Sequence, residues 1–338
     1  MTKNLDTNGN HLPHSVGVVY SDVKREYFPT EAQYLTEKQA KADAQVIASC
    51  LQKMGITAHL FPANSDLPQA LKKTRPDMVL NLTGSVKGNE SLASTVPALM
   101  ELLDLPYTGA GILGESLSYN KFLVKKLMEQ HGLPVPHYQL FNHYTDPLSP
   151  SLRFPLISKL NEIHGAVEIT RDAVSDTPRH LQDRVKYLIA TYEQPVLVEE
   201  FIVGREITAF LLEGMKKKVY LAEKIFKNTG EKYIFANFED QWLSKDPEII
   251  TYQKYTDPIL EAYVRQAFKI MRMADLGKFD VRLDSSGRYF FIDANSNPYL
   301  APKEMDCPLA NILELFYGIT FSEILRRLLQ NTMAASSA

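Results

Sequence analysis

The sequence lacks most features that would point to a secreted, membrane-spanning or nucleic-acid-binding protein. Only two of its 338 residues are cysteines, Cys50 and Cys307. They lie far apart without the spacing of a metal site, which favours a reducing compartment. No apolar run approaches the ~20 residues that cross a bilayer, and the net charge of −3 gives no reason to expect a membrane or nucleic acid as partner. We therefore expect a cytoplasmic enzyme or binding protein.

A P-loop pattern, G-x-x-x-x-G-K-S/T, is also missing from the sequence. What is present first is an alternation of strands and helices in the amino-terminal third. We expect strands over 15–20, 56–61 and 77–82, and helices over 31–54, 66–74 and 91–103. This alternation is typical of a parallel α/β layer, in which ligands bind at the carboxyl ends of the strands.

The rest of the chain reads as a mixture of short strands and longer helices. We expect helices over 118–132, 258–274 and 308–329, a strand over 154–160, and two strand halves within 196–212. The apolar stripe of the last helix is expected to pack on the body rather than to bind a partner. A chain of this length favours two or three subdomains over a single core.

Residues 277–300 read GKFDVRLDSSGRYFFIDANSNPYL and predict a β-hairpin. The segments 278–283 and 288–292 are rich in aromatic and β-branched residues, and the turn formers DSSG separate them. The hairpin therefore brings together acidic side chains that are distant in sequence.

Two aspartates on this hairpin are candidate metal ligands. With a symmetric turn, Asp280 is expected opposite Phe291, so that Asp280 and Asp293 share a face as diagonal neighbours, roughly 7–8 Å apart at Cα. Asn295 adds an amide oxygen on the same side. Oxygen ligands suit Mg²⁺ or Mn²⁺, although a surface hairpin with solvated acids is the alternative.

Charged residues inside two apolar strands are the other unusual feature. Lys159 ends one strand, and Glu199 and Glu206 stand within VLVEEFIVGREITAFLL. Burial of such carboxylates is costly unless each has a partner. Lys159 either reaches an anion or extends its amine to the surface, and Glu200 is expected on the solvated face.

Four segments in one order resemble the ATP-grasp superfamily and, within it, the D-alanine–D-alanine ligase branch. They are LPYTGAG followed by NK, the apolar strand ending in lysine, VEEFIVGRE, and FDVRLD…FFIDANSNP. The resemblance covers about residues 79–300. It implies an α/β fold in three parts, with a Rossmann-like parallel sheet at the amino terminus and an α+β ATP-grasp part. The expected divisions are a flexible arm, an amino-terminal domain, a central lid, a metal-binding subdomain and a tail, over residues 1–14, 15–117, 118–198, 199–330 and 331–338.

The resemblance also implies roles for individual residues. ATP would lie between the last two domains, with a pair of lysines on its phosphates, a strand of four residues along its base, a glutamate on its ribose, and three oxygen ligands holding two Mg²⁺ ions, or Mn²⁺. In that order the residues are Lys121 and Lys159; Glu199, Glu200, Phe201 and Ile202; Glu206; and Asp280, Asp293 and Asn295.

Several positions depart from the family pattern. The glycine-rich G-G-x-S-x-E stretch is missing, and Glu26 is only a loose substitute. The lid serines are replaced by Gly165 and Ala166. A family lysine aligns with Gln241, for which Lys232 or Lys245 could substitute.

The metal hairpin departs from the pattern as well. Lys278 replaces an arginine and keeps the charge without its bidentate geometry, so Arg282 could supply the guanidinium; these two are the candidate catalytic residues. Tyr299 replaces a glycine and narrows the site. The nucleotide apparatus is thus kept while the substrate contacts differ.

The resemblance implies an ATP-dependent carboxylate–amine ligase that joins an amino acid or small peptide to an amine through an acyl phosphate, releasing ADP and phosphate. The alternatives are an ATP-grasp kinase acting on a small-molecule hydroxyl, and an ATP-binding protein without catalysis. Relatives in this superfamily are often dimers, so a homodimer is possible.

Overall fold

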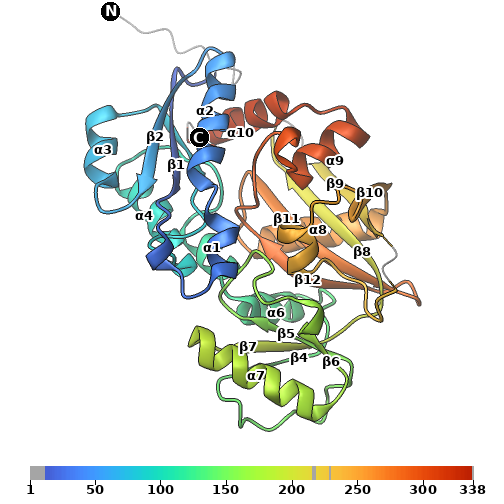
Figure 1. The fold of residues 1–338 in the computed structure, drawn as a ribbon. Coiled ribbons are helices and arrows are strands. Elements are labelled where there is room, and N and C mark those ends of the chain that lie inside the picture. Colours follow the sequence, from blue (N-terminus) through green and yellow to red (C-terminus); the bar gives the residue numbers. More distant parts are fainter. Residues whose placement is uncertain (1–11, 215–217, 228–229, 337–338) are drawn as a thin grey trace, which may run out of the picture.

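The computed structural model describes residues 12–214, 218–227 and 230–336. The strands in these ranges form three sheets. Figure 1 shows the amino-terminal sheet at the upper left, a four-stranded sheet at the bottom and a five-stranded sheet at the right. Most of the arm expected over residues 1–14 lies outside the described residues. The mixed α/β class expected from the sequence is confirmed.

The amino-terminal layer is a parallel sheet in the order β2-β1-β3, as expected. Its strands and helices are β1 (Ser15–Ser21), α1 (Glu31–Glu37), α2 (Ala40–Lys53), β2 (Thr57–Ala63), α3 (Leu67–Thr74), β3 (Met78–Leu82) and α4 (Thr95–Leu102).

The single helix expected over 31–54 is wrong, because the chain breaks between α1 and α2. Helix α2 buries Ala44, Ile47 and Leu51 in the core that also contains the strands of this sheet. Helix α1 buries only Gln33, and its carboxyl end turns toward the interior of the protein. The two helices therefore pack against different parts of the protein, and they do not form one continuous helix.

The central sheet has the order β4-β7-β5-β6 and is covered by α7. The elements are β4 (Tyr138–Phe141), β5 (Leu156–Leu160), β6 (Val174–Ser175), α7 (Pro178–Tyr192) and β7 (Val196–Glu200). Leu181, Val185 and Leu188 of α7 are in the core cluster of this sheet. The expected domain boundary between residues 198 and 199 falls inside β7, so a boundary after residue 200 fits the sheets better.

Two helices, not one, occupy the region around residue 118. They are α5 (Ile112–Ser118) and α6 (Lys121–Gln130). Asn120 separates them, because its side chain accepts a hydrogen bond from the backbone N–H of Leu123 at 3.0 Å and begins α6. Val124 and Met128 of α6 lie in the core of the five-stranded sheet. By packing, α6 therefore belongs with that sheet and not with the lid expected over 118–198.

The five-stranded antiparallel sheet has the order β10-β9-β8-β11-β12. Its elements are β8 (Gly204–Leu212), β9 (Lys218–Phe226), β10 (Ile250–Tyr255), α8 (Pro258–Ile270), β11 (Leu276–Asp284) and β12 (Tyr289–Asn295). Strand β9 was not predicted, because charged residues interrupt its apolar pattern. In the fold, Glu223 pairs with Arg205, and Lys224 pairs with Glu206 and Asp280.

The register of the β11–β12 hairpin differs from the expectation. Val281 pairs with Phe291, but Asp280 pairs directly with Asp293, which makes Ile292 an extra residue in β12. The expected pairing of Asp280 with Phe291 is wrong because an odd number of residues separates the strands at the turn. The bulge returns Asp293 to the face of Asp280, so the shared face is still formed.

The carboxyl terminus forms two helices, α9 (Pro308–Tyr317) and α10 (Phe321–Ser336), separated at Gly318 with φ 64°. Their apolar side chains share a core with β1 and α2, which confirms packing on the body. Because α10 continues to Ser336, the tail expected from residue 331 is helical over most of its length. No helix in the described ranges is long and apolar enough to cross a membrane.

Short helical turns complete the connections. They are η1 (Arg25–Tyr27), η2 (Glu90–Ser94), η3 (Arg171–Ala173), the π-helical η4 (Glu239–Leu243) and η5 (Lys303–Met305).

Candidate functional site

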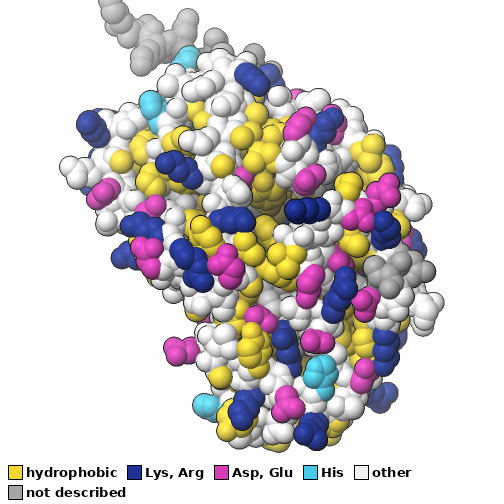
Figure 2. Space-filling view, in the orientation of Figure 1, with side chains coloured by type: hydrophobic (Ala, Val, Ile, Leu, Met, Phe, Trp, Pro, Cys, Tyr) yellow, Lys and Arg dark blue, Asp and Glu magenta, His cyan; other side chains and the backbone are white. Residues whose placement is uncertain are grey.

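One cavity of about 1470 Å³ lies between the three sheets and is lined by every site residue predicted from the sequence. Figure 2 shows the surface hollowed near the middle of the molecule, where apolar side chains are flanked by lysine and arginine. The predicted residues that line the cavity are Lys121, Lys159, Glu199, Glu200, Phe201, Ile202, Glu206, Lys278, Asp280, Arg282, Asp293 and Asn295.

An aromatic frame bounds one part of the cavity. The ring of Phe201 lies edge-on to Tyr233 and Phe235, at centroid distances of 5.1 and 5.6 Å. The guanidinium carbon of Arg282 lies 4.9 Å from the centroid of Phe201. A mostly apolar frame of aromatic rings, with a cation on one of them, suits contact with an aromatic base.

Arg282 is only 3% exposed and braces this frame. Its guanidinium donates to the carbonyl oxygens of Ile202 at 3.1 Å and Ile234 at 2.8 Å, and to Glu206 Oε2 at 3.3 Å. These contacts hold the guanidinium against the backbone and the glutamate that surround the frame. They do not support the catalytic role expected for Arg282 and favour a positioning role.

Glu199 is fully buried between two lysines. Lys159 Nζ lies 3.2 Å from one of its carboxylate oxygens and Lys125 Nζ lies 3.3 Å from the other. Lys159 also donates to the carbonyl of Ile292 at 3.2 Å, and Lys125 to that of Phe291 at 2.7 Å. The cluster therefore joins the central sheet and α6 to the metal hairpin.

Lys125 was not predicted as a site residue. It lies four positions after Lys121, hence on the same face of α6, and that spacing was the available signal. Burial lowers the pKa of Lys125 to about 8, against the opposing effect of Glu199. Glu200, which follows Glu199 in the chain, is less buried than Glu199. Its Oε1 accepts a hydrogen bond from the backbone N–H of Arg153 at 3.0 Å.

Lys121 and His164 both line the cavity beside the central sheet. Lys121 Nζ donates to the carbonyl of Ile163 at 2.6 Å, and burial lowers its pKa although Asp293 and Glu90 oppose this. His164 Nδ1 lies 2.8 Å from Glu90 Oε2. Its other ring nitrogen has no hydrogen-bond partner within the described chain, so the site offers a free imidazole nitrogen.

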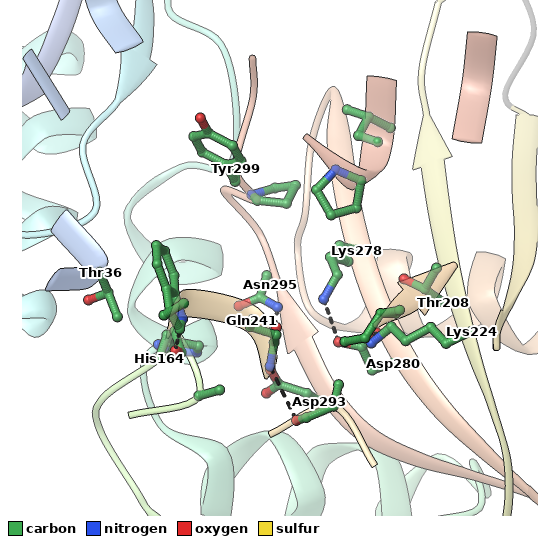
Figure 3. Close-up of a pocket in the computed structure, with 18 of the residues that line it drawn as sticks. Thr36, His164, Thr208, Lys224, Gln241, Lys278, Asp280, Asp293, Asn295 and Tyr299 are labelled. Atoms are coloured by element: carbon green, nitrogen blue, oxygen red, sulfur yellow. Dashed lines mark hydrogen bonds and ion pairs between the residues drawn. The ribbon is translucent and has the colours of Figure 1, made fainter. Parts of the chain in front are cut away.

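The β11–β12 hairpin presents the carboxylate and amide oxygens predicted as metal ligands to the cavity (Figure 3). Asp293 accepts a hydrogen bond from Asn295 at 3.4 Å. Burial acts to raise the pKa of Asp293, but Lys121, His164 and Lys278 outweigh it and lower the pKa. Its carboxylate is therefore ionised and suited to a hard cation.

A metal ion at this place would depend on the nucleotide for part of its coordination. Within the described chain, no three His, Cys, Asp or Glu side chains are grouped so that they could hold a metal ion. Mg²⁺ is commonly held by one or two carboxylates together with phosphate oxygens and water. The donor set Asp293 and Asn295 fits that kind of site.

Lys224 on β9 is a cavity residue that the sequence did not reveal. Its ammonium lies 2.7 Å from Glu206 Oε1 and 3.0 Å from Asp280 Oδ1. Burial acts to lower the pKa of Lys224, but Asp280 and Glu206 outweigh it and raise the pKa. The signal was hidden because β9 itself was not predicted.

A second unpredicted residue, Glu37, lies at the amino-terminal side of the cavity. Ser85 donates to Glu37 Oε2 at 2.8 Å. Burial and the nearby Glu90 raise the pKa of Glu37 to about 7. Glu26, the loose substitute suggested by the sequence, is exposed and does not line the cavity. Glu37 is the last residue of α1, directly before the helix break.

Two loops close over the cavity. Trp242 Nε1 donates to the carbonyl of Gly165 at 2.7 Å. Gln241 donates instead to backbone carbonyls of its own turn. Of the two lysines that could replace the family lysine at Gln241, Lys245 lines the cavity, whereas Lys232 is 68% exposed and pairs with Asp176.

Comparison with known proteins agrees with this geometry. The family described as "D-ala D-ala ligase C-terminus" matches residues 127–330, more than half of the chain. An uncharacterised protein of Sinorhizobium fredii is 28% identical over 76% of this chain and 79% of its own length. The D-alanine–D-alanine ligase of Xylella fastidiosa is 28% identical over 85% of this chain and 92% of its own length.

A solved structure shows the same fold. The D-alanine–D-alanine ligase of Bacillus anthracis complexed with ATP superimposes with a TM-score of 0.73 at 16% identity, covering 96% of this chain and 99% of that one. The fold and the nucleotide-type cavity thus define an ATP-grasp enzyme, an ATP-dependent ligase that joins a carboxylate to an amine. Within that class, the chain belongs to the D-alanine–D-alanine ligase family.

Proposed function

We propose that this ligase activates the carboxylate of an amino acid or small peptide as an acyl phosphate and then joins it to an amine. The observation that carries this proposal is the convergence on one cavity of the Phe201 frame, the lysines Lys121 and Lys159, and the carboxylate of Asp293. The aromatic frame suits the base of ATP, the lysines suit its phosphates, and the carboxylate suits the divalent ion that accompanies them.

ATP would lie with its base against Phe201 and Ile202, which directly follow Glu199 and Glu200 at the end of β7. Glu206 would accept hydrogen bonds from the ribose hydroxyls. Lys121 and Lys159 would donate to the phosphates, whose negative charge offsets the burial of both ammonium groups. Lys159 already bonds Glu199, so it would connect the base and phosphate ends of the nucleotide.

A divalent cation, Mg²⁺ or Mn²⁺, would be held by Asp293 and Asn295 and would neutralise charge on the transferred phosphoryl group. The sequence predicted two such ions, with Asp280 as a further ligand. In the structure, however, both oxygens of Asp280 already contact ammonium groups.

The reaction requires two displacements. A carboxylate oxygen of the substrate attacks the γ-phosphorus, the bond to the bridging oxygen breaks, and ADP leaves with the electron pair. The amine nitrogen then attacks the acyl carbon, the C–O bond to phosphate breaks, and the amine loses a proton. The protein contributes position and electrostatic stabilisation, for which Lys278 is placed beside Asp280 at the hairpin.

Substrate recognition is proposed to lie on the amino-terminal side of the cavity. Glu37 and Glu90 line it together with Ser21, and carboxylates there suit the ammonium group of an amino acid. The side chain of Tyr299 also lines the cavity, where the family pattern has glycine. We therefore propose a substrate pair other than two D-alanines, because the glycine-rich stretch that holds the first D-alanine in the family is absent.

Incubation with ATP, Mg²⁺ and pooled amino acids, followed by mass spectrometry, tests the proposal. A condensed product with equal amounts of ADP and free phosphate is expected. A phosphorylated product without free phosphate would establish a kinase instead, and ATP binding without ADP formation would establish a protein without turnover. A homodimer remains a prediction that sedimentation velocity would test.

A further inference from the structure

Asp280 is held by two ammonium groups at once. Lys224 Nζ lies 3.0 Å from its Oδ1, and Lys278 contacts its Oδ2. Asp280 is 7% exposed and the Lys224 side chain is 8% exposed. Both oxygens that a metal ion would use therefore already have buried or half-buried cationic partners.

The sheet register places Lys224 there. Glu206 on β8 pairs with Lys224 on one side and with Arg282 on the other. Asp280 is two residues from Arg282 on β11 and so faces the same way. Lys224 reaches diagonally across β8 to Asp280 while it also bonds Glu206 at 2.7 Å. Figure 3 shows Lys224 and Lys278 on either side of Asp280.

A divalent ion at Asp280 would have to displace one of these ammonium groups or lie beside it. Lys224 is buried, and its ammonium contacts both Asp280 and Glu206. Displacement would leave a buried ammonium with Glu206 as its only carboxylate partner within the described chain, and Arg282 already contacts that glutamate. Like charges at ionic contact inside a protein repel strongly.

Asp293 provides the contrast. Within the described residues, no lysine or arginine forms an ion pair with it, and its side-chain hydrogen bond comes from Asn295 at 3.4 Å. The nearest cations act on it through space, since Lys121 donates to a backbone carbonyl. Asp293 and Asn295 are therefore open to a metal ion in a way that Asp280 is not.

We propose that the site holds one divalent ion per nucleotide, on Asp293 and Asn295, and that Lys224 with Lys278 supplies at Asp280 the positive charge of a second ion. This inference rests on the proposed function, since it concerns the ion that accompanies ATP. Lys224 becomes a positioning residue that holds Glu206 and Asp280 together, and Lys278 is a second cation on Asp280 that lines the cavity.

Mn²⁺ counting tests the inference without turnover. The protein is held in excess over a non-hydrolysable ATP analogue with an imido bridge, and free Mn²⁺ is measured by electron paramagnetic resonance. One tightly bound Mn²⁺ per nucleotide complex is expected for the wild type. Two tightly bound ions would overturn the inference, and none would instead contradict the metal assignment in the proposed function.

Two variants free one oxygen of Asp280 each. Lys224→Met and Lys278→Met are expected to gain a second Mn²⁺ with at least tenfold higher affinity than in the wild type, whereas Lys224→Arg keeps one. Lys269→Met, an exposed lysine on α8, is the matched control and keeps one. If both methionine variants melt cooperatively and still bind a single ion, the lysines are not what replaces the second metal and the inference fails.

Discussion

Asp280 lies directly opposite Asp293 across β11 and β12, and this pairing exists because Ile292 is an extra residue in β12. Without the bulge, the register set by Val281 and Phe291 would turn Asp293 to the other face of the sheet. The pairing brings together two carboxylates with different partners. Asp280 bonds lysines, whereas Asp293 is free to bind a cation.

Asp293→Asn should lower metal-dependent turnover at least roughly 100-fold while the fold persists. The change removes the negative charge of the side chain and keeps its size and shape. ADP release and thermal melting measure the two effects. Asp183→Asn, at an exposed position on α7, is the control and should keep full activity. Unchanged turnover in Asp293→Asn would show that Asp293 is not a metal ligand.

Glu206→Gln should weaken ATP binding by about 1.5–3 kcal/mol, the value of a charge-assisted hydrogen bond, or roughly 10- to 150-fold. Trp242 is the single tryptophan of the chain and lines the cavity, so its fluorescence can follow an ATP titration. An affinity equal to that of the wild type would remove Glu206 from the nucleotide site.

Glu206→Ala is a harsher change than the sequence alone suggests. Glu206 neutralises both Lys224 and Arg282, so the truncation leaves two buried cations short of a partner. Removal of one partner from a buried ion pair costs about 3–5 kcal/mol. Urea unfolding should show that loss for Glu206→Ala and a smaller one for Glu206→Gln; equal stability of the two variants would contradict this account.

Lys125→Met should destabilise the protein by about 3–5 kcal/mol, because Glu199 then loses one of its two buried cations. Lys126→Met is the matched control on the next residue. In the wild type, the side chain of Lys126 is half exposed and its ammonium pairs with Glu129 at 3.5 Å, a contact worth about 0–1 kcal/mol. Chemical denaturation compares the two, and similar losses would mean that the Glu199 cluster does not stabilise the fold.

Glu37 should make stability depend on pH. Its pKa rises from 4.5 to about 7 on folding, so between these values the folded protein holds a proton that the unfolded chain has released. Stability should therefore fall as the pH rises from 5 to 8, with up to about 3 kcal/mol from this group. Glu37→Gln should remove that part of the fall, as measured by urea unfolding at both pH values.

The same residue should affect substrate binding in the opposite direction. If Glu37 holds the ammonium group of the substrate, its charged form is required, so the KM for that substrate should rise as the pH falls below about 7. Glu37→Gln should have a high KM with little pH dependence, while its KM for ATP stays near that of the wild type. A wild-type pH profile in Glu37→Gln would place the ammonium elsewhere.

The sequence by itself determined the parts of the site whose signals are local. The spacing of Asp293 and Asn295, the lysine at the end of an apolar strand, and glutamates within VEEFIVGRE are visible without a fold, because each contradicts its immediate surroundings. The parallel amino-terminal layer was likewise predictable from the alternation of strands and helices. Every residue selected in this way lies on one cavity.

Only the tertiary structure decided which charges meet. Lys224 reaches Asp280 through the register of three strands, and Asp293 faces Asp280 because of one bulged residue. Glu37, at the end of α1, lines the cavity beside Ser85. Ion pairs between distant strands depend on strand register and on burial, and no local pattern in the sequence reveals either. The residues proposed to bind the nucleotide can therefore be recognised in the sequence, whereas the ion pairs that bear on the proposed number of metal ions and on substrate recognition form only on folding.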